Sequence, residues 1–219
     1  MEFILTESEF NEDNTAWNGN RFLMGNGYFG IRGTLEEYTK KQMCAVNMAG
    51  IYDKMGNSWR ESVNAPNPLY TYIKVNGKIY ALPDEKPKFH QQELDFRYGI
   101  HSRVTHWQTE HGNITVVCER FASIARQHNI AMKYTFSVDF DCEAEIITGI
   151  DGDVWDINGP HFVKMKIGSK DGADYVTGIT GEKNISVTVK EYIRTDFQAE
   201  QTNQNTDKSI FRHIKFSAK

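Results

Sequence analysis

Apolar and polar residues alternate along much of the chain, most regularly between residues 130 and 140. Apolar side chains occupy every second position of this segment: Ile130, Met132, Tyr134, Phe136, Val138 and Phe140. The positions between them include Lys133, Thr135, Ser137 and Asp139. Residues two apart share one face of a strand but scatter around a helix. The pattern therefore predicts a strand with one buried face.

Two further pairs of apolar segments predict β-hairpins. Asn76-Gly77 separates residues 70–75 from residues 78–82, and both turn residues tolerate the positive φ that a tight hairpin requires. Residues 103–109 and 114–121 are joined by a short polar turn that contains a glycine. We therefore expect antiparallel pairing between neighbouring segments of the chain.

The remaining signals extend this pattern to the whole chain. Later strands are predicted at residues 162–167, 185–189 and 210–216, with glycine-bearing turns at residues 170–172 and 181–184. No long amphipathic helix is evident, and only residues 6–17 suit a short one. Strands at this spacing predict an all-β fold, an antiparallel two-sheet β-sandwich with few short helices. We expect residues 1–219 to form one domain.

Composition and charge narrow the class of protein. The chain is 39% hydrophobic and 12% aromatic, which is typical of a globular protein. Its formal net charge is -4 and its Lys and Arg residues are spread along the chain, so no nucleic-acid partner is expected. No apolar run reaches the length of a membrane span, and the N-terminus lacks the pattern of a secretory signal. No membrane partner is therefore expected.

The three cysteines suggest a reducing compartment. Cys44, Cys118 and Cys142 are odd in number and widely spaced, so neither a zinc site nor a disulfide framework is expected. Reduced thiols are typical of cytoplasmic proteins. We therefore expect a cytoplasmic location and no bound metal.

A glycine-rich run spans residues 23–37 and contains four glycines. It lacks the Gly-Lys-Ser/Thr ending of a phosphate-binding loop, and no helix-forming run follows it. The simpler interpretation is a turn-rich stretch in which one backbone segment passes close to another.

Residues 149–161 form a predicted loop that is rich in polar and aromatic side chains. The loop contains Asp151, Asp153, Trp155, Asp156 and His161. Its spacing lacks the glutamate of a calcium-binding EF-hand loop. Two carboxylates about 5–10 Å apart suit a glycosidase site, and a tryptophan ring packs well on a sugar. The alternative is a connecting loop with solvated acids, and the sequence leaves both interpretations open.

Other charged residues are expected to have structural roles. Two pairs of charged residues that are close in sequence are candidates for ion pairs at strand ends. They are Asp95 with Arg97, and Glu119 with Arg120. Such pairs contribute under about 1 kcal/mol when they are exposed. His101 and His106 are five residues apart in a predicted strand, so they face opposite sides and make no metal site. No Ser–His–Asp or Cys–His set is apparent, and we assign no catalytic residue.

Several short motifs, taken together, resemble a known enzyme family. They are Gly25-Asn26-Gly27-Tyr28-Phe29-Gly30-Ile31-Arg32-Gly33, Glu36-Glu37, Ala49-Gly50-Ile51-Tyr52, Val63-Asn64-Ala65-Pro66-Asn67, Leu94-Asp95-Phe96-Arg97-Tyr98-Gly99, Arg120-Phe121-Ala122-Ser123 and Gly149-Ile150-Asp151-Gly152. In content and order they resemble the N-terminal domain of glycoside hydrolase family 65, which includes maltose, kojibiose, trehalose and nigerose phosphorylases. The resemblance covers nearly the whole chain.

The resemblance implies a large antiparallel super-sandwich that is normally followed by helical linkers and an (α/α)6 barrel. It implies phosphorolysis of an α-glucoside with inversion, with inorganic phosphate as co-substrate and no other cofactor. In that family the glutamate general acid and the phosphate-binding residues lie in the barrel. Nothing in residues 1–219 matches the barrel, so we expect a catalytically inactive N-terminal domain that belongs to a larger protein.

The resemblance also suggests where this domain meets its partners, which are expected to be its own barrel and a second copy in a homodimer. The acid-rich loop is the candidate substrate-facing or barrel-facing segment, through Asp151, Asp153, Trp155, Asn158 and His161. The glycine-rich run is the candidate domain-docking turn, through Asn26, Tyr28 and Arg32. The isolated domain is expected to expose apolar surface and to self-associate.

A second function remains open at the level of sequence. Sandwich folds host lectin-like sites, so the chain is alternatively a stand-alone carbohydrate-binding module. In that case exposed aromatic side chains such as Trp59, Trp107 or Trp155 would stack on sugar rings.

Overall fold

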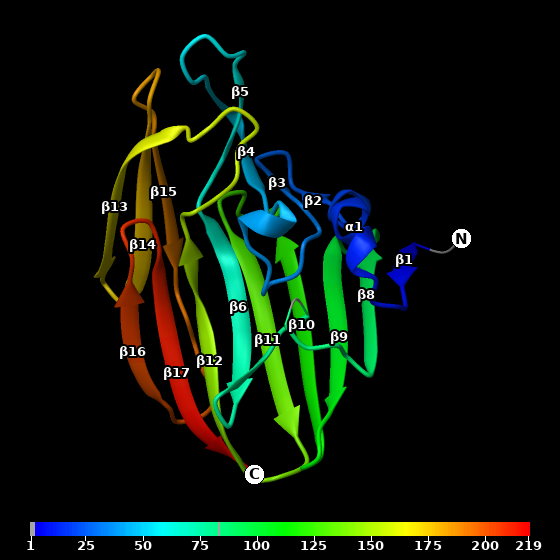
Figure 1. The fold of residues 1–219 in the computed structure, drawn as a ribbon. Coiled ribbons are helices and arrows are strands. Elements are labelled where there is room, and N and C mark those ends of the chain that lie inside the picture. The colour runs from blue at the N-terminus through cyan, green and yellow to red at the C-terminus, as the bar shows by residue number, and fades with distance from the viewer. Residues whose placement is uncertain (1–2, 83) are drawn as a thin grey trace.

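The computed structural model describes residues 3–82 and 84–219. These residues form four antiparallel sheets with few short helices, which confirms the prediction of a mainly β protein (Figure 1). The strands divide among four sheets, whereas the sequence predicted two. None of the helices among the described residues is long and apolar enough to cross a membrane.

The four sheets are numbered I to IV. Sheet I contains, in spatial order, β1 (Ile4–Glu7), β8 (Phe89–Asp95), β9 (Ile100–Gln108), β10 (Asn113–Ala122) and β11 (Ile130–Val138). Sheet II contains β16 (Glu200–Asn205), β17 (Ile210–Ala218), β12 (Cys142–Asp151), β6 (Asn67–Val75) and β7 (Lys78–Tyr80). Sheet III contains β13 (Phe162–Lys170), β14 (Ala173–Thr180) and β15 (Ser186–Glu191). Sheet IV contains β2 (Met24–Gly25), β3 (Phe29–Ile31), β4 (Val46–Asp53) and β5 (Glu61–Asn64).

Three short helices lie outside the sheets. They are η1 (Glu12–Asn14), α1 (Thr15–Arg21) and η2 (Lys40–Gln42). The helix expected within residues 6–17 is displaced, because Ile4–Glu7 pairs with β8 as an edge strand and α1 begins only at Thr15. Asn11 caps the N-terminus of η1 by accepting a hydrogen bond from the Asp13 backbone N–H.

Three hydrophobic clusters hold the sheets together. Sheets I and II share the largest one, in which Ile114 and Val116 of β10 face Ile73 of β6 and Ile146 of β12. A second cluster joins β2, β3 and the start of β4 in sheet IV to the other three sheets. A third cluster packs sheet III on sheet II. Each apolar side chain that leaves water here stabilises the fold by roughly 1.5–3 kcal/mol. Sheets III and IV thus have their own apolar contacts with sheet II.

The predicted hairpin at Asn76-Gly77 is confirmed. Both turn residues have positive φ, 49° at Asn76 and 81° at Gly77, and they connect β6 to β7. The predicted strand at residues 130–140 is β11, although its apolar side chains are half-buried rather than fully buried. The reason is its position, because β11 is an edge strand of sheet I and, among the described residues, has a neighbouring strand on one side only.

The glycine-rich run is a site of close backbone approach, as predicted. The Gly33 backbone N–H donates to the Gly19 carbonyl at 2.8 Å. A Cβ atom at Gly33 would lie 2.6 Å from the backbone carbon and oxygen of Phe22, which is closer than real Cβ contacts allow. Gly33 therefore lets α1 and the run that follows β3 pack directly against each other.

Replacing Gly33 with alanine is expected to lower the free energy of unfolding by about 1–3 kcal/mol, because the added methyl group forces the backbone apart. Gly30→Ala is the matched control, since a Cβ there meets no atom within 4 Å. Urea unfolding followed by circular dichroism would measure both variants. Equal stability of the two alanine variants would contradict the close approach at Gly33.

Candidate functional site

The acid-rich loop lies at one end of the molecule with two other connections. Residues 152–161 link β12 in sheet II to β13 in sheet III. Beside them lie residues 54–60, which connect β4 to β5, and residues 181–185, which connect β14 to β15 (Figure 1). The Gly181 backbone N–H donates to the His161 carbonyl at 3.0 Å. These three connections are called the upper loops.

His161 ties the upper loops together. Its Nε2 lies 2.8 Å from Oε1 of Glu61 at the start of β5, and its Nδ1 lies 3.3 Å from Oδ2 of Asp53 at the end of β4. The other Asp53 oxygen accepts the Glu182 backbone N–H at 2.9 Å. Glu61 also accepts two bonds of 2.9 Å, from the backbone N–H and the side-chain amide of Asn158. One buried imidazole thus links all three connections.

The charges around His161 favour its protonated form. Burial alone lowers the pKa of His161, but hydrogen bonds to Glu61 and Asp53 and the charge of Asp156 outweigh it, so the pKa is raised. Burial tends to raise the pKa of Glu61, whereas the Asn158 and His161 hydrogen bonds bring it below its ordinary value. Both shifts favour an imidazolium at His161 held between carboxylates.

Replacing His161 with glutamine is expected to lower the free energy of unfolding by about 1.5–3 kcal/mol at pH 6, the range for hydrogen bonds to charged groups. Because the folded pKa is raised, this stabilisation is complete below pH 6.5 and is lost as the pH rises through the folded pKa. Urea unfolding of both proteins at pH 6 and pH 9 measures the difference. A difference that grows toward pH 9 would contradict the imidazolium.

The same cluster contains donor types that bind divalent cations. Ligand atoms of Glu61, Asp156 and His161 lie within 4.8 Å of one another. Both Glu61 oxygens and both His161 nitrogens, however, already have hydrogen-bonding partners within the protein. The arrangement is satisfied as a hydrogen-bond network, so we do not interpret it as a metal centre.

The other acids of the loop are engaged separately. Asp151 is buried, and its Oδ1 accepts from Ser209 Oγ at 2.8 Å and from the Asp153 backbone N–H at 3.0 Å. Asp153 forms ion pairs with Lys40 at 2.6 Å and Lys208 at 2.9 Å. The two carboxylates thus fix the loop to sheet II and to η2. In the described part of the chain, neither carboxylate faces an open cleft.

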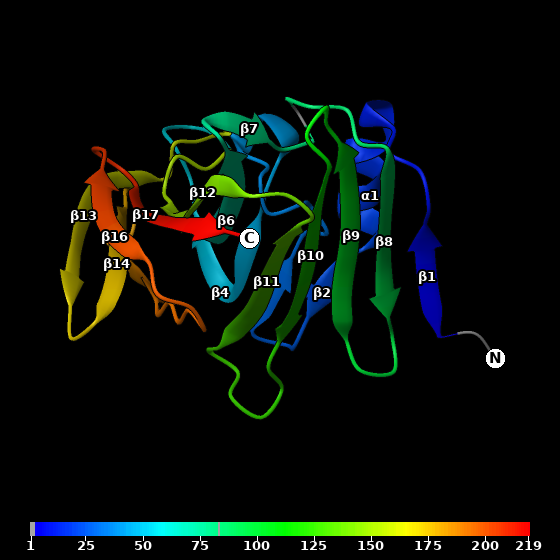
Figure 2. The same cartoon turned by 90° about the horizontal axis from the view of Figure 1, so that it is seen from below.

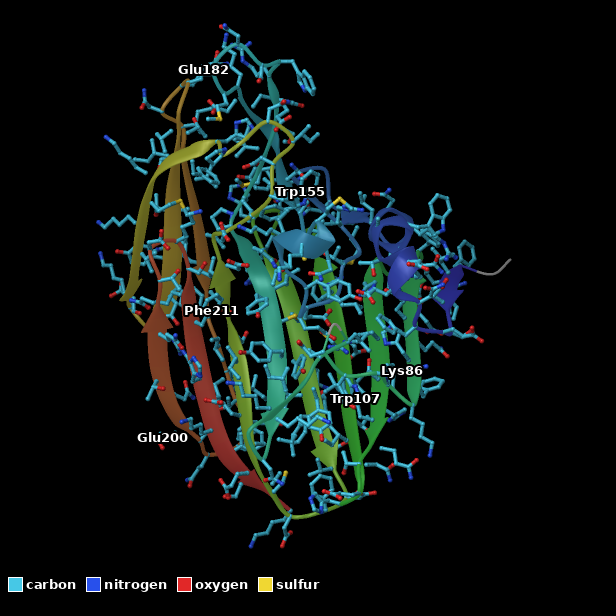
Figure 3. The ribbon with its side chains drawn as sticks, viewed as in Figure 1. Lys86, Trp107, Trp155, Glu182, Glu200 and Phe211 are labelled. Atoms are coloured by element: carbon cyan, nitrogen blue, oxygen red, sulfur yellow. The ribbon has the colours of Figure 1, made fainter. Side chains whose placement is uncertain are left out.

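Of the three tryptophans expected to be exposed, two differ from the expectation. Trp155 is half-buried, and its carbonyl accepts a 3.0 Å bond from the Asn64 side chain; Figure 3 shows it nearer the sheets than Glu182, which lies at the outer tip. The expectation that Trp107 is exposed is wrong. Trp107 is 2% exposed in the core of sheet I, where its indole N–H donates to the Glu85 carbonyl at 3.0 Å (Figure 3). Trp59 in the upper loops is 65% exposed and remains accessible.

The candidate docking turn is held by internal contacts. The Asn26 side chain accepts from the Phe29 backbone N–H at 2.8 Å and donates to the Ser123 carbonyl at 2.7 Å. Tyr28 stacks on His128 with ring centroids 4.3 Å apart. Arg32 donates to the carbonyls of Ala16 at 2.7 Å and Met43 at 3.2 Å. These bonds tie the turn to the β10–β11 connection and to α1.

A buried charge network lies beneath this turn, and the sequence did not predict it. Glu36 bridges two arginines, with Arg103 Nε and Arg120 Nη1 each 2.9 Å from its oxygens. Arg103 also contacts Glu37 at 2.5 Å, and Arg120 donates to the Thr34 carbonyl. All four charged side chains are at most 1% exposed. They join the segment after β3 to the inner face of β9 and β10.

The expected ion pairs at strand ends are not the ones that form. Arg120 pairs with Glu36 rather than with its neighbour Glu119, because adjacent strand residues point to opposite faces and only Arg120 points inward. Asp95 accepts the backbone N–H of Arg97 at 2.8 Å and so stabilises a turn. The opposite orientation of His101 and His106 is confirmed, since His101 is buried and His106 is half-buried.

The network changes the protonation of its members. Burial tends to raise the pKa of Glu36, but the charges of Arg120 and Arg103 lower it to about 2. Burial raises the pKa of Glu37. Burial and the charge of Arg103 lower the pKa of nearby His90 to about 4, and burial and Arg120 lower that of His101. Both histidines are therefore neutral beside two fixed positive charges.

All three cysteines are free and buried, as expected for reduced thiols. Burial raises the pKa of Cys44 to about 11. A thiol with this pKa and no access to solvent is a poor nucleophile. None of the three is therefore a candidate catalytic group.

Comparison with known proteins places this chain in a family. Residues 5–219 match the family described as "Glycosyl hydrolase family 65, N-terminal domain". The chain is 45% identical over 208 residues to nigerose phosphorylase from Lachnoclostridium phytofermentans, which covers 94% of this chain and 28% of that protein. It is 37% identical over 193 residues to 1,2-alpha-glucosylglycerol phosphorylase from Bacillus selenitireducens, covering 87% of this chain and 25% of that protein.

A solved structure has the same fold. The putative kojibiose phosphorylase from human microbiome superposes with a TM-score of 0.87 at 19% identity, over 99% of this chain and 30% of that one. The present chain thus spans between a quarter and a third of the length of these relatives. On the extent of the match, the chain belongs to glycosyl hydrolase family 65, and residues 5–219 form the N-terminal domain that defines this part of the family.

Proposed function

We propose that this chain is the accessory N-terminal domain of an inverting phosphorylase that cleaves an α-glucoside disaccharide with inorganic phosphate. Two relatives are phosphorylases by name, and this chain covers about a quarter of each. The acids of the upper loops are engaged in hydrogen bonds and ion pairs rather than gathered in a cleft. Catalysis is therefore assigned to the part of the enzyme outside residues 1–219.

The upper loops are the face that we assign to the catalytic domain or to the rim of its active site. The observation that carries this assignment is the His161 network, which holds three connections rigidly around one buried charge. Above it, Met55, Trp59 and Ile157 are each at least half exposed. Exposed apolar side chains on a fixed frame suit contact with another protein surface.

The remaining parts of the proposal concern assembly and location. We assign a second docking role to the turn at Asn26, Tyr28 and Arg32, which is rigid for the reasons given above. The loop residues Asp151, Asp153, Trp155, Asn158 and His161 shape the rim and carry out no chemistry. The enzyme is a cytoplasmic homodimer, needs no cofactor or metal, and uses phosphate as its co-substrate.

A chimera tests this face. In it, residues 1–219 replace the matched region of the Lachnoclostridium phytofermentans nigerose phosphorylase. Trp59→Ala in the upper loops is expected to lower kcat/KM for nigerose about threefold to tenfold. Without the indole ring the rim of the active site would shift, and the substrate would be positioned less accurately. Phe96→Ala is the matched control, because Phe96 is also exposed but lies in the β8–β9 turn. Unchanged kinetics in the Trp59 variant would rule out the assigned face.

The alternative function is a stand-alone carbohydrate-binding module, and the exposure of Trp59 is the observation that favours it. A sugar that stacks on this ring would change tryptophan fluorescence. Titration of the isolated chain with nigerose and maltose distinguishes the two functions. The accessory role predicts no saturable change at millimolar sugar, and a saturable change that Trp59→Ala abolishes would support the alternative.

A further inference from the structure

A large groove lies between sheets I and III. Its volume is about 700 Å3, and residues of β11, β15 and the segment after β15 line its two sides. Its floor is sheet II, through Leu69 and Thr71 of β6, Ile146 and Thr148 of β12, and Ile214 of β17. In Figure 2 the orange segment that follows β15 runs beside this space.

Both sides of the groove are sheet edges. Among the described residues, β11 pairs only with β10, and β15 pairs only with β14. Each strand therefore has one row of backbone N–H and C=O groups without a strand partner. Such edges are templates for pairing with a further strand.

The two edges lie in one layer. β14 and β15 pack on β12, β6 and β17 of sheet II, and β11 packs on the same sheet through the core that sheets I and II share. Ile130 and Met132 of β11 belong to the same cluster as Val187 and Val189 of β15. The groove is thus a gap between two edge strands above a common floor.

The inward-facing side chains of β11 are only partly covered by neighbouring residues. Ile130, Met132 and Tyr134 point inward and are half-buried, and they line the groove. On the neighbouring strand β10, Ile114 and Val116, which share a core with Tyr134, are fully buried. A further strand beside β11 would cover the remaining apolar surface.

An acceptor without a partner also faces the groove. Glu191 at the end of β15 lines it, and its Oε2 is buried without a hydrogen-bond partner in the described structure. Its other oxygen is 3.4 Å from Thr148 Oγ1. Burial and the charge of Asp174 raise the pKa of Glu191 to about 7. A strand in the groove would bring backbone N–H donors to this oxygen.

We propose that the groove receives one extended polypeptide segment, which adds to the edge of β11 as a new strand and extends sheet I toward sheet III. The segment comes from the part of the polypeptide that, in the longer relatives, follows the region matched by this chain. Strand addition suits the site better than a sugar does, because two facing edges offer backbone pairing along the whole groove. The segment has apolar residues at alternate positions, facing the floor.

The proposal rests on the observed groove and on the family, and not on the function proposed above. Overlapping synthetic peptides that cover the region following the match in the Lachnoclostridium phytofermentans nigerose phosphorylase are titrated into the folded chain. Binding is measured by fluorescence anisotropy, and backbone hydrogen exchange is measured by NMR. One peptide is expected to bind saturably and to slow exchange at every second amide of β11, because alternate amides point to the open edge.

Two substitutions on β11 locate the peptide. Met132→Asp places a charge on the inward face and is expected to weaken binding at least tenfold, whereas Lys133→Asp on the outward face changes it less than twofold. The exchange pattern of the unmodified chain decides the matter if Met132→Asp does not fold. Three results would overturn the proposal: no peptide binds, binding leaves β11 exchange unchanged, or the same amides become protected as chain concentration rises, which would make a second copy the occupant.

Discussion

Replacing Glu36 with glutamine is expected to lower the free energy of unfolding by about 3–5 kcal/mol, the range for breaking a buried ion pair. Glu36 is the bridge of the buried network, with Arg103 and Arg120 each 2.9 Å from its oxygens. The substitution keeps the shape of the side chain but removes its charge. Arg103 would then keep Glu37, whereas Arg120 would keep only the Thr34 carbonyl and would lack a counter-charge in a region closed to water.

Glu119→Gln is the matched control. It makes the same chemical change one residue from Arg120, on the exposed face of β10, and is expected to alter stability by no more than about 0.5 kcal/mol. Urea unfolding at pH 7 would measure both variants. If the Glu36 variant unfolded at nearly the same urea concentration as the unmodified chain, the network would not contribute to stability as described.

The second large effect is expected from the titration of His90. His90 is buried and its pKa is lowered to about 4, first by burial and then by Arg103, whereas an unfolded histidine titrates near 6.5. Between these values the unfolded chain binds a proton that the folded chain does not, so the folded state loses stability as the pH falls. At 1.36 kcal/mol per pKa unit, His90 alone accounts for about 3 kcal/mol between pH 6.5 and pH 4.

Other groups act in the same direction. His101 has a lowered pKa in the same window, and Glu36 loses its stabilising charge as the pH falls from 4.5 toward 2. His161, Glu37 and Glu191 act oppositely, because their raised pKa values favour the folded state at low pH. Because the raised pKa of Glu191 opposes His90 over a similar pH range, the effect of His90 is measured by its own substitution and not by the total stability.

The pH dependence is assigned with two variants. His90→Gln is expected to reduce the slope of unfolding free energy against pH between 4 and 6.5, whatever its effect on stability at pH 7. His111→Gln is the control, because His111 lies in an exposed turn outside the buried charge network. An unchanged slope in the His90 variant would contradict the buried neutral histidine.

Strands with strong side-chain patterns could be predicted from sequence, and strands held mainly by their backbone could not. The alternation at residues 130–138 predicted β11, and Asn76-Gly77 predicted the β6–β7 turn. By contrast, all six side chains of β16 are polar and exposed, and this strand exists because its backbone pairs with β17. The division into four sheets depends on contacts between distant segments, which local periodicity does not describe.

The candidate site shows the same limit. The sequence identified His161 and its neighbouring acids, but its partners Asp53 and Glu61 lie about a hundred residues away along the chain and only the fold brings them together. The paired acids at residues 36–37 and Arg120 each occur in a motif, yet nothing in the local sequence shows that they pair. A signal was available in the position of Arg120, which falls in phase with the inward-facing Val116 and Cys118 of β10 and therefore requires a buried counter-charge.

One comparison tests the central claim, that residues 1–219 support catalysis by another part of the enzyme. Release of glucose 1-phosphate from nigerose and inorganic phosphate is measured for the folded isolated chain and for the chimera with the rest of the Lachnoclostridium phytofermentans enzyme. We expect no release by the isolated chain, and release by the chimera with the nigerose preference unchanged. Phosphate-dependent cleavage by the isolated chain would contradict the account.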